Sequence, residues 1–351
     1  MSGIIGHTTY AILAAKAASH HKLPITPILQ RHFASYLAGS YLGSDVQTLP
    51  AAVCQDTGEE VGYCAARITE SPITGGPVTP WKLSLDGTQY TPLEIHNRFY
   101  GRAHLVFGWD DAERELAVAW DELPKYLAAV VGDALTLFGP GERKLAYVFG
   151  WMTHVAGDSL IKSVQPGITL HLLDGRYTPR NRPVQDLVSF HEIGRKELRI
   201  DWPSLLADLV DTPVEPVQLH FMRVAKPQGR LAALFPEGWK AEDEPLLARV
   251  LAENRRYQRI RNGRILDQLD LKRTAAGWQC DQSLSRQTGG LTYAEMVEAA
   301  DAADFRHALW QMGEEIVDLF VRVIQEEPLL GDFPVGSGPT WQQLSGRWRK
   351  Q

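Results

Sequence analysis

Cysteine is scarce in this sequence. The chain of 351 residues has three, Cys54, Cys64 and Cys280, and no two of them form a Cys-x-x-Cys pair. This spacing argues against a thiolate zinc site and against the dense disulfide framework of small secreted proteins. Cys54 and Cys64 could form one bridge in an oxidising compartment, but we favour reduced thiols and a cytoplasmic location.

Long apolar runs are also missing. No stretch reaches the roughly 18 apolar residues from which a membrane-spanning helix is inferred, so we predict no transmembrane segment. The N-terminal stretch MSGIIGHTTYAILAAKAASHHK has an apolar middle, but no basic segment precedes it. We therefore interpret it as a helix of the mature protein and not as a signal peptide.

Positive charge is not in excess. Lys and Arg total 36 against 42 Asp and Glu, which gives a net charge of −6. Proteins that bind the nucleic-acid backbone usually carry a basic surface. The charge balance therefore argues against a nucleic-acid partner, although it leaves room for a local cleft that binds one.

What the sequence does contain is helical periodicity. Its composition, 44% apolar and 22% charged, is that of a globular protein. Capping boxes at Thr91–Glu94 and Thr292–Glu295 each begin a helix, and we expect the second helix to continue to about Gln325. We predict a mostly α protein with a helical domain at 1–205, a helical extension at 206–330 that could pack on the same core, and a loosely held tail at 331–351.

Residues 46–90 interrupt the helical pattern. Pro, Gly and Thr are frequent there, and no helical period is visible. We predict a long irregular insertion with room for a short hairpin. A connection of this length inside a compact domain is usually functional.

The segment at 143–164 predicts a helix that is apolar on nearly every face, which is typical of a helix at the centre of a fold. It carries His154 and Asp158, which are four residues apart and therefore lie on one face. A buried carboxylate is normally paired or bound to a metal. The two residues thus form either a hydrogen bond within the core or part of a cation site.

Other residues with ligand chemistry lie near helix ends. Asp45 follows a predicted helix C-terminus, where the helix dipole disfavours an anion, so a metal would explain it better than capping, although aspartate is also common in plain turns. His96 and His104 are about 80° apart around one helix, so both are not expected on one ion. The full set is His7, Asp45, His96 or His104, His154, Asp158 and His191. This mixture of nitrogen and oxygen ligands suits Zn²⁺.

Three segments resemble motifs of the zinc-dependent phospholipase C family, which includes the catalytic domain of glycosylphosphatidylinositol-specific phospholipase D. GIIGH at 3–7 resembles Gly-Ile-x-x-His, and AGSYLGSD at 38–45 is similar to Ala-Gly…Pro-Asp. AYVFGWMTHVAGD at 146–158, the most specific, resembles Phe-x-x-Gly-x-x-x-His-x-x-x-Asp. The resemblance covers roughly residues 1–200.

The resemblance implies a multi-helix bundle of the phospholipase C and zinc nuclease type. It implies zinc ligation by His7, Asp45, His154 and Asp158, with His104 preferred over His96 as a further ligand. The implied activity is that of a metal-dependent phosphoric ester hydrolase. In that activity metal-activated water attacks a phosphodiester or a phospholipid headgroup, and Asp45 or a nearby carboxylate is the general base. A zinc-type nuclease is the alternative enzyme.

Two positions depart from the family pattern. Lys162 occupies a position where the family usually has a histidine, and Arg195 follows His191 where an acidic ligand is usual. Glu192 or Glu197 could replace that ligand. Since lysine and arginine are cationic and offer no lone pair to a metal, our hypothesis is that one metal position is missing and that Lys162 and Arg195 bind phosphate instead. We predict one to three zinc ions in all, and a full set of three would contradict the missing position.

The same departures fit a different protein, a catalytically degenerate helical bundle that acts in binding or as a structural protein. A third interpretation is that all these histidines are packing or surface residues. It predicts that His7, Asp45, His154 and Asp158 are scattered in space.

Overall fold

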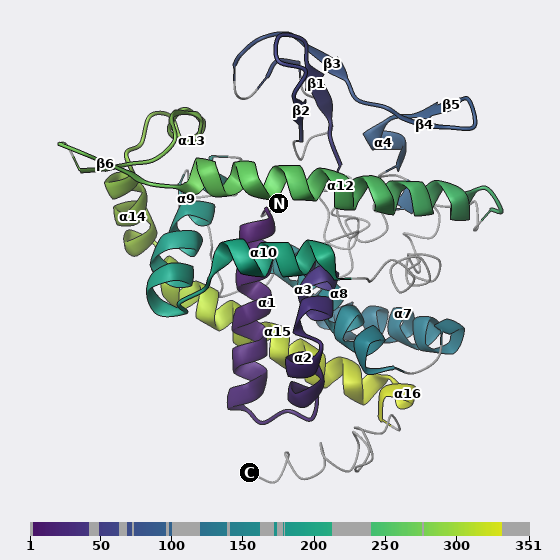
Figure 1. Cartoon of the computed structure of the whole chain (residues 1–351). Coiled ribbons are helices and arrows are strands. Elements are labelled where there is room, and N and C mark those ends of the chain that lie inside the picture. The colour runs from purple at the N-terminus through teal and green to yellow at the C-terminus, as the bar shows by residue number, and fades with distance from the viewer. Residues whose placement is uncertain are drawn as a thin grey trace.

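A computed structural model of the chain describes residues 3–41, 49–62, 69–71, 74–95, 98–99, 120–138, 141–161, 172–173, 178, 180–212, 240–275 and 277–331. It confirms that the protein is mostly α (Figure 1). Among the helices that the structure describes, none combines the length and apolarity needed to cross a membrane.

The helices of the first two thirds are α1 (Ile4–His20), α2 (Thr26–Arg31), α3 (Phe33–Tyr41), α4 (Pro92–Ile95), the 3-10 helix η3 (Trp120–Glu122), α7 (Leu123–Phe138), α8 (Glu142–Ile161), α9 (Asn181–Val188), the π-helix η4 (Ser189–Glu197) and α10 (Trp202–Asp211). Those that follow are α12 (Asp243–Leu269), α13 (Gln282–Gln287), α14 (Tyr293–Ala302), α15 (Phe305–Glu326) and α16 (Pro328–Gly331).

The central helix is α8, as its apolar sequence indicates. Its residues from Leu145 to Leu160 are all buried. It packs against α1, α3 and α15, and their apolar side chains form one hydrophobic core together with those of α7, α9, α10 and α14. The C-terminal helices α14 and α15 therefore share a core with the N-terminal ones.

Two glycines bring α3 and α8 into backbone contact. A Cβ atom on Gly39 would overlap the carbonyl oxygen of Tyr147, and one on Gly150 would overlap that of Tyr36. Both glycines belong to segments that carry the phospholipase C resemblance. Their backbones approach more closely than any larger residue would permit.

The expected single helix from Thr292 to about Gln325 is wrong. The capping box of Thr292 and Glu295 forms as predicted, but the helix ends at Ala302 and α15 starts anew at Phe305. Asp304 separates them in the left-handed conformation, with φ of 50°. Aspartate tolerates that conformation better than most residues, so the break is a turn that the helical periodicity does not reveal.

The described part of the predicted irregular insertion contains short strands. These are β1 (Ala52–Cys54), β2 (Glu60–Val61), β3 (Val78–Pro80), β4 (Leu83–Leu85) and β5 (Thr88–Tyr90), and the hairpin β6 (Lys272–Thr274) and β7 (Gly277–Gln279) lies further along the chain. An antiparallel sheet has the order β2-β1-β3, and β4 pairs with β5. With two or three residues each, such strands are too short for an alternating pattern to be recognised.

Helix α12 lies between this insertion and the helical body (Figure 1). Near its start, Leu246, Leu247 and Val250 pack with Trp81 and Leu83 in a second, smaller core. Further along, Arg256 contacts Glu60 of β2 with two hydrogen bonds of 2.8 Å. The insertion is thereby fixed on one side of α12.

The glycine contact between α3 and α8 predicts a large penalty for a single methyl group. Gly150→Ala should lower the free energy of unfolding by about 1–3 kcal/mol or more, because the overlap is with backbone atoms that cannot rotate away. Denaturant unfolding measures it. Gly263→Ala is the matched control, since Gly263 is an exposed residue of α12 and no atom lies within 4 Å of the new Cβ. It should stabilise by about 0.5–1 kcal/mol. Equal stability of Gly150→Ala and the wild type would show that the helices are not in backbone contact.

Candidate metal centre

Three of the predicted ligands meet in the core. His7 lies in the first turn of α1, whereas His154 and Asp158 lie one turn apart on α8. One potential ligand atom from each residue lies within 4.8 Å of the other two, and all three side chains are fully buried. The structure thus contradicts, for these three residues, the interpretation that the histidines and aspartates are scattered.

The distances in this group suit ligands of one ion. His7 Nε2 lies 3.4 Å from Asp158 Oδ1, and His154 Nε2 lies 3.9 Å from Asp158 Oδ2. Both exceed an ordinary N–H···O hydrogen bond. Two ligand atoms at about 2.0–2.2 Å from a tetrahedral zinc ion are themselves about 3.3–3.5 Å apart. The His7–Asp158 distance therefore already matches that of two ligands on one zinc ion.

A backbone carbonyl fixes the tautomer of His154. Nδ1 lies 3.0 Å from the carbonyl oxygen of Ser40, so Nδ1 carries the proton and donates it. Ser40 is in the last turn of α3, where carbonyl groups have no partner within their own helix. With Nδ1 protonated, the neutral ring presents a lone pair at Nε2, on the side of Asp158. A hydrogen bond of this kind on the far nitrogen is usual for metal-binding histidines.

His7 provides the strongest sign of a missing group. Both of its ring nitrogens are buried, and neither has a hydrogen-bond partner among the residues that the structure describes. Its ring stacks on His154, with centroids 4.3 Å apart, and lies 5.8 Å from the rings of Tyr10 and Tyr41. Buried polar nitrogens are nearly always bonded. Two imidazoles and a carboxylate fit a zinc ion, which would supply a partner for one of the two His7 nitrogens.

Several predicted site residues lie outside the described residues. These are Asp45, His96, His104 and Lys162. Their predicted roles as ligands, general base or phosphate contact stay predictions.

His191 lies apart from the three clustered ligands. Its Nε2 lies 2.6 Å from the carbonyl oxygen of Leu269, to which it donates a hydrogen bond. Burial lowers the pKa of His191, although the hydrogen bond to Leu269 opposes that effect. The imidazole of His191 is therefore neutral and connects η4 with the end of α12 through this hydrogen bond.

The two carboxylates that could have replaced an acidic ligand after His191 have other partners. Tyr293 donates a hydrogen bond of 2.5 Å to Glu192, and Lys196 forms an ion pair with it. Desolvation raises the pKa of Glu192, but hydrogen bonds from Lys196 and Tyr293 outweigh it and leave the pKa below its usual value. Glu197 forms an ion pair with Arg306.

Arg195 is held on the protein surface. Its guanidinium lies over the ring of Phe190, 4.6 Å from the centroid, and 3.9 Å from Asp270 Oδ1. Its side chain is 44% exposed, whereas the three clustered ligands are fully buried. The described contacts of Arg195 therefore connect η4 with the end of α12.

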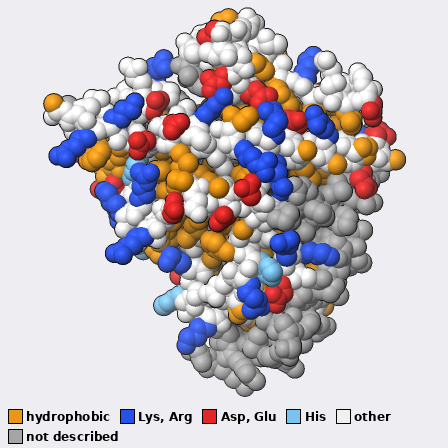
Figure 2. All heavy atoms as spheres, viewed as in Figure 1, with side chains coloured by type: hydrophobic (Ala, Val, Ile, Leu, Met, Phe, Trp, Pro, Cys, Tyr) orange, Lys and Arg blue, Asp and Glu red, His pale blue; other side chains and the backbone are white. Residues whose placement is uncertain are grey.

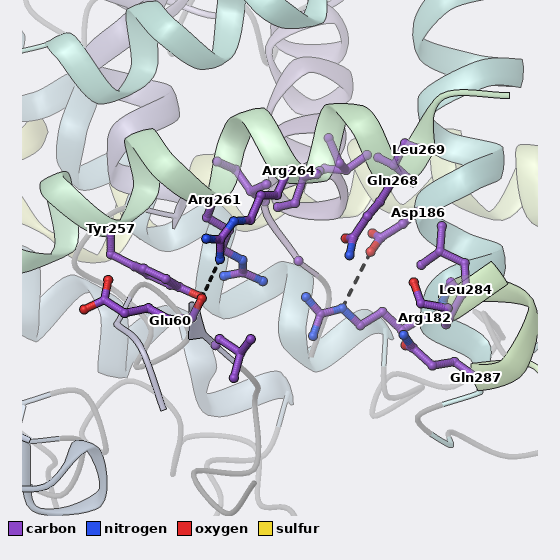
Figure 3. A pocket seen from close by; sticks show the side chains of 18 residues that line it. Glu60, Arg182, Asp186, Tyr257, Arg261, Arg264, Gln268, Leu269, Leu284 and Gln287 are labelled. Carbon is purple, nitrogen blue, oxygen red and sulfur yellow. Dashed lines mark hydrogen bonds and ion pairs between the residues drawn. The ribbon is translucent and has the colours of Figure 1, made fainter. Parts of the chain in front are cut away.

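Sequence patterns do not reveal the group of arginines that lies beside the candidate metal centre. Arg182 of α9 and Arg261 and Arg264 of α12 line one cavity, together with Asp186 and Tyr257 (Figure 3). On α12, positions 257, 261 and 264 recur at helical spacing, so they share one face. That spacing was the available signal, but it does not distinguish a cavity wall from a solvated face.

No family model, curated protein or solved structure matches this chain. The three segments quoted above are thus the whole basis of the resemblance to phospholipase C.

The geometry predicts that zinc stabilises the protein through this group. After removal of metal, free zinc at about 100 times its dissociation constant should add about 2.7 kcal/mol to the free energy of unfolding. Asp158→Asn and His7→Gln should abolish the gain, whereas His191→Gln should retain it. Denaturant titrations with and without zinc measure this effect. Retention of the gain in Asp158→Asn would place the zinc elsewhere.

A second prediction concerns acid stability without metal. Because the pKa of His191 is lowered on folding, the unfolded chain takes up a proton below about pH 6.5 that the folded protein does not. His191 thus costs stability as the pH falls from 6.5 toward its folded pKa. Between pH 7.5 and 5.0, in chelator, His191→Gln should lose less unfolding free energy than the wild type. Equal losses would mean that His191 titrates normally in the folded protein.

Proposed function

We propose that this protein is a metal-dependent phosphoesterase that resembles phospholipase C and uses zinc. The observation that carries the proposal is the meeting of His7 with His154 and Asp158 in one buried group. These residues come from two segments for which the sequence resemblance implies zinc ligation. Their convergence supports that implication independently of the motifs.

The role of each described residue follows from its contacts. A zinc ion supplies a Lewis acid for phosphoester hydrolysis when it is bound. Asp158 would hold it from α8 between the two imidazoles, and the Ser40 carbonyl would keep the His154 lone pair directed inward. Asp45 is proposed as a ligand and general base and His104 as a further ligand. Lys162 and Arg195 are proposed as phosphate contacts, of which Arg195 would first have to leave Asp270.

The substrate class that we propose is a small phosphodiester or a phospholipid headgroup. On the face viewed in Figure 2, the acidic and basic side chains of the described residues are interspersed and form no continuous basic surface. Together with the net charge of −6, this arrangement favours a small substrate over a nucleic acid. A zinc-type nuclease is the less favoured form of the same proposal.

One observation favours a second function. His7, His154 and Asp158 are each 0% exposed, and closed sites are typical of structural zinc. The second candidate is therefore a non-catalytic bundle in which the metal holds α1 against α8. It predicts zinc binding without turnover.

Hydrolysis of bis(p-nitrophenyl) phosphate distinguishes the two functions. The zinc-loaded protein should hydrolyse it, chelator should abolish turnover, and Asp158→Asn should lower kcat/KM by at least about 100-fold, because loss of even an outer contact to a ligand costs about 10–100-fold. Asp211→Asn, whose side chain is 64% exposed, is the matched control and should be as active as the wild type.

The number of zinc ions bound per chain tests the hypothesis about Lys162. One or two zinc ions per chain would agree with a lost metal position at Lys162, whereas three would contradict it. A folded protein that binds zinc but hydrolyses neither this diester nor short-chain phospholipids or dinucleotides would overturn the enzyme in favour of the structural bundle.

A further inference from the structure

A cavity of about 140 Å³ lies between α1, α9, α12 and the strand β2. An apolar cavity of about 150 Å³ is large enough to bind benzene, so this one can hold a group the size of a phosphate. Its walls include charged and polar side chains from segments far apart in the sequence. Figure 3 shows Arg182 facing the arginines that extend from α12.

The three arginines are held in place by their neighbours. Arg261 is 9% exposed and donates a hydrogen bond of 2.8 Å to the hydroxyl of Tyr41. Arg264 lies 2.8 Å from Glu59, and Arg182 lies 3.6 Å from Asp186. Guanidinium groups already fixed in position lose little conformational freedom when an anion binds.

Arg182 is also packed against the start of α1. A Cβ atom on Gly3 would lie 2.6 Å from Arg182 Nη2. The absence of a side chain on Gly3 therefore allows the guanidinium to lie against the helix N-terminus.

Two carboxylates also line the cavity, and each of them lies beside an arginine. Glu60 accepts two hydrogen bonds from Arg256, which also forms an ion pair with Glu253. Desolvation raises the pKa of Asp186, although the positive charges of Arg182 and Arg261 oppose that shift. Of the three arginines, Arg264 and Arg182 thus lie beside the carboxylates of Glu59 and Asp186, whereas Arg261 donates its described hydrogen bond to a neutral hydroxyl group.

The N-terminus of α1 adds to the positive potential. Gly3, Ile4 and Ile5 line the cavity, and α1 is 17 residues long with no acidic residue in its first turn. Its N-cap, Gly3, offers no side chain to the backbone N–H groups of the first turn. Such groups and the helix dipole bind phosphate readily.

The cavity adjoins the metal centre. The Tyr41 hydroxyl accepts a hydrogen bond from Arg261, and the ring of Tyr41 lies 5.8 Å from that of His7. Ile5 lines the cavity two residues before His7 on α1. One tyrosine and the first turn of α1 therefore separate the arginines from the candidate ligands.

We infer that this cavity binds a phosphate group through Arg182, Arg261 and the N-terminus of α1. Phosphate oxygens match the paired N–H groups of guanidinium. That this phosphate belongs to the substrate rests on the proposed phosphoesterase function, whereas the binding of phosphate itself does not.

Calorimetric titration of the metal-free protein with inorganic phosphate tests the inference. The wild type should bind phosphate, and Arg182→Gln and Arg261→Gln should each raise the dissociation constant at least about tenfold. Arg259→Gln is the matched control, because Arg259 lies on the same helix, pairs with Asp211 and is 56% exposed. It should bind as the wild type does. Absence of phosphate binding by the folded wild type, or equal affinity in all four proteins, would overturn the inference.

A more conservative variant guards against loss of the fold. Arg261→Lys keeps the charge but cannot present paired N–H groups, so it should bind phosphate more weakly than the wild type and more tightly than Arg261→Gln. Circular dichroism of each variant establishes that it is folded. Equal binding by Arg261→Lys and Arg261→Gln would contradict a role for the charge of this residue.

The failure of this inference is distinguishable from that of the proposed function. Zinc binding by Arg182→Gln should equal that of the wild type, since the described ion pair of Arg182 is with Asp186 and not with His7, His154 or Asp158. Phosphate binding without zinc binding would support the anion site and overturn the proposed phosphoesterase function. Displacement of bound phosphate by dihexanoyl phosphatidylcholine would identify the ligand as a lipid phosphate. Failure of this lipid to displace phosphate would identify the ligand as the free anion.

Discussion

Two backbone contacts, Gly39 against Tyr147 and Gly150 against Tyr36, bring α3 and α8 closer than side chains on both helices would allow. This distance is what places the carbonyl oxygen of Ser40, the residue after Gly39, within 3.0 Å of His154 Nδ1. A backbone carbonyl has no rotamers, so it orients the imidazole without loss of side-chain entropy. The chemistry of His154 therefore depends on the absence of two Cβ atoms.

Because the helices pack so closely, the burial of polar side chains among them has a large cost in folding free energy. His7, His154 and Asp158 lie inside a core formed by most of the helices. Moving a carboxylate out of water costs several kcal/mol unless a cation and hydrogen bonds compensate for it. Hydrophobic residues at these positions would stabilise the bundle more simply. That polar residues occur instead, at distances that suit zinc ligands, argues that the group is retained for binding.

Features that depend on neighbouring residues in the sequence are predictable, whereas features that depend on contacts between distant segments are not. Helix periodicity and capping boxes are local, so α8 and the start of α14 were predicted, as was the single face of His154 and Asp158. His7 was predicted as a candidate ligand, and the resemblance implied that it binds zinc together with His154 and Asp158, but no local pattern predicts that it lies against that face. The turn at Asp304 and the arginine cavity were missed, because one depends on a single backbone angle and the other on the docking of α9 beside α12.

The residues of the segments that resemble phospholipase C differ in what explains them: some are explained by helix packing, and others are better explained by ligand binding. Gly39 and Gly150 are explained by helix contact alone, so their presence argues for the fold and says nothing about catalysis. His7 has no comparable packing explanation, since an aliphatic residue would fill the same space without two unsatisfied nitrogens. Arg182 and Arg261 line the adjoining cavity, a position that helix packing alone does not require. His7 and these arginines, more than the motifs, therefore favour a protein that binds a metal and an anion.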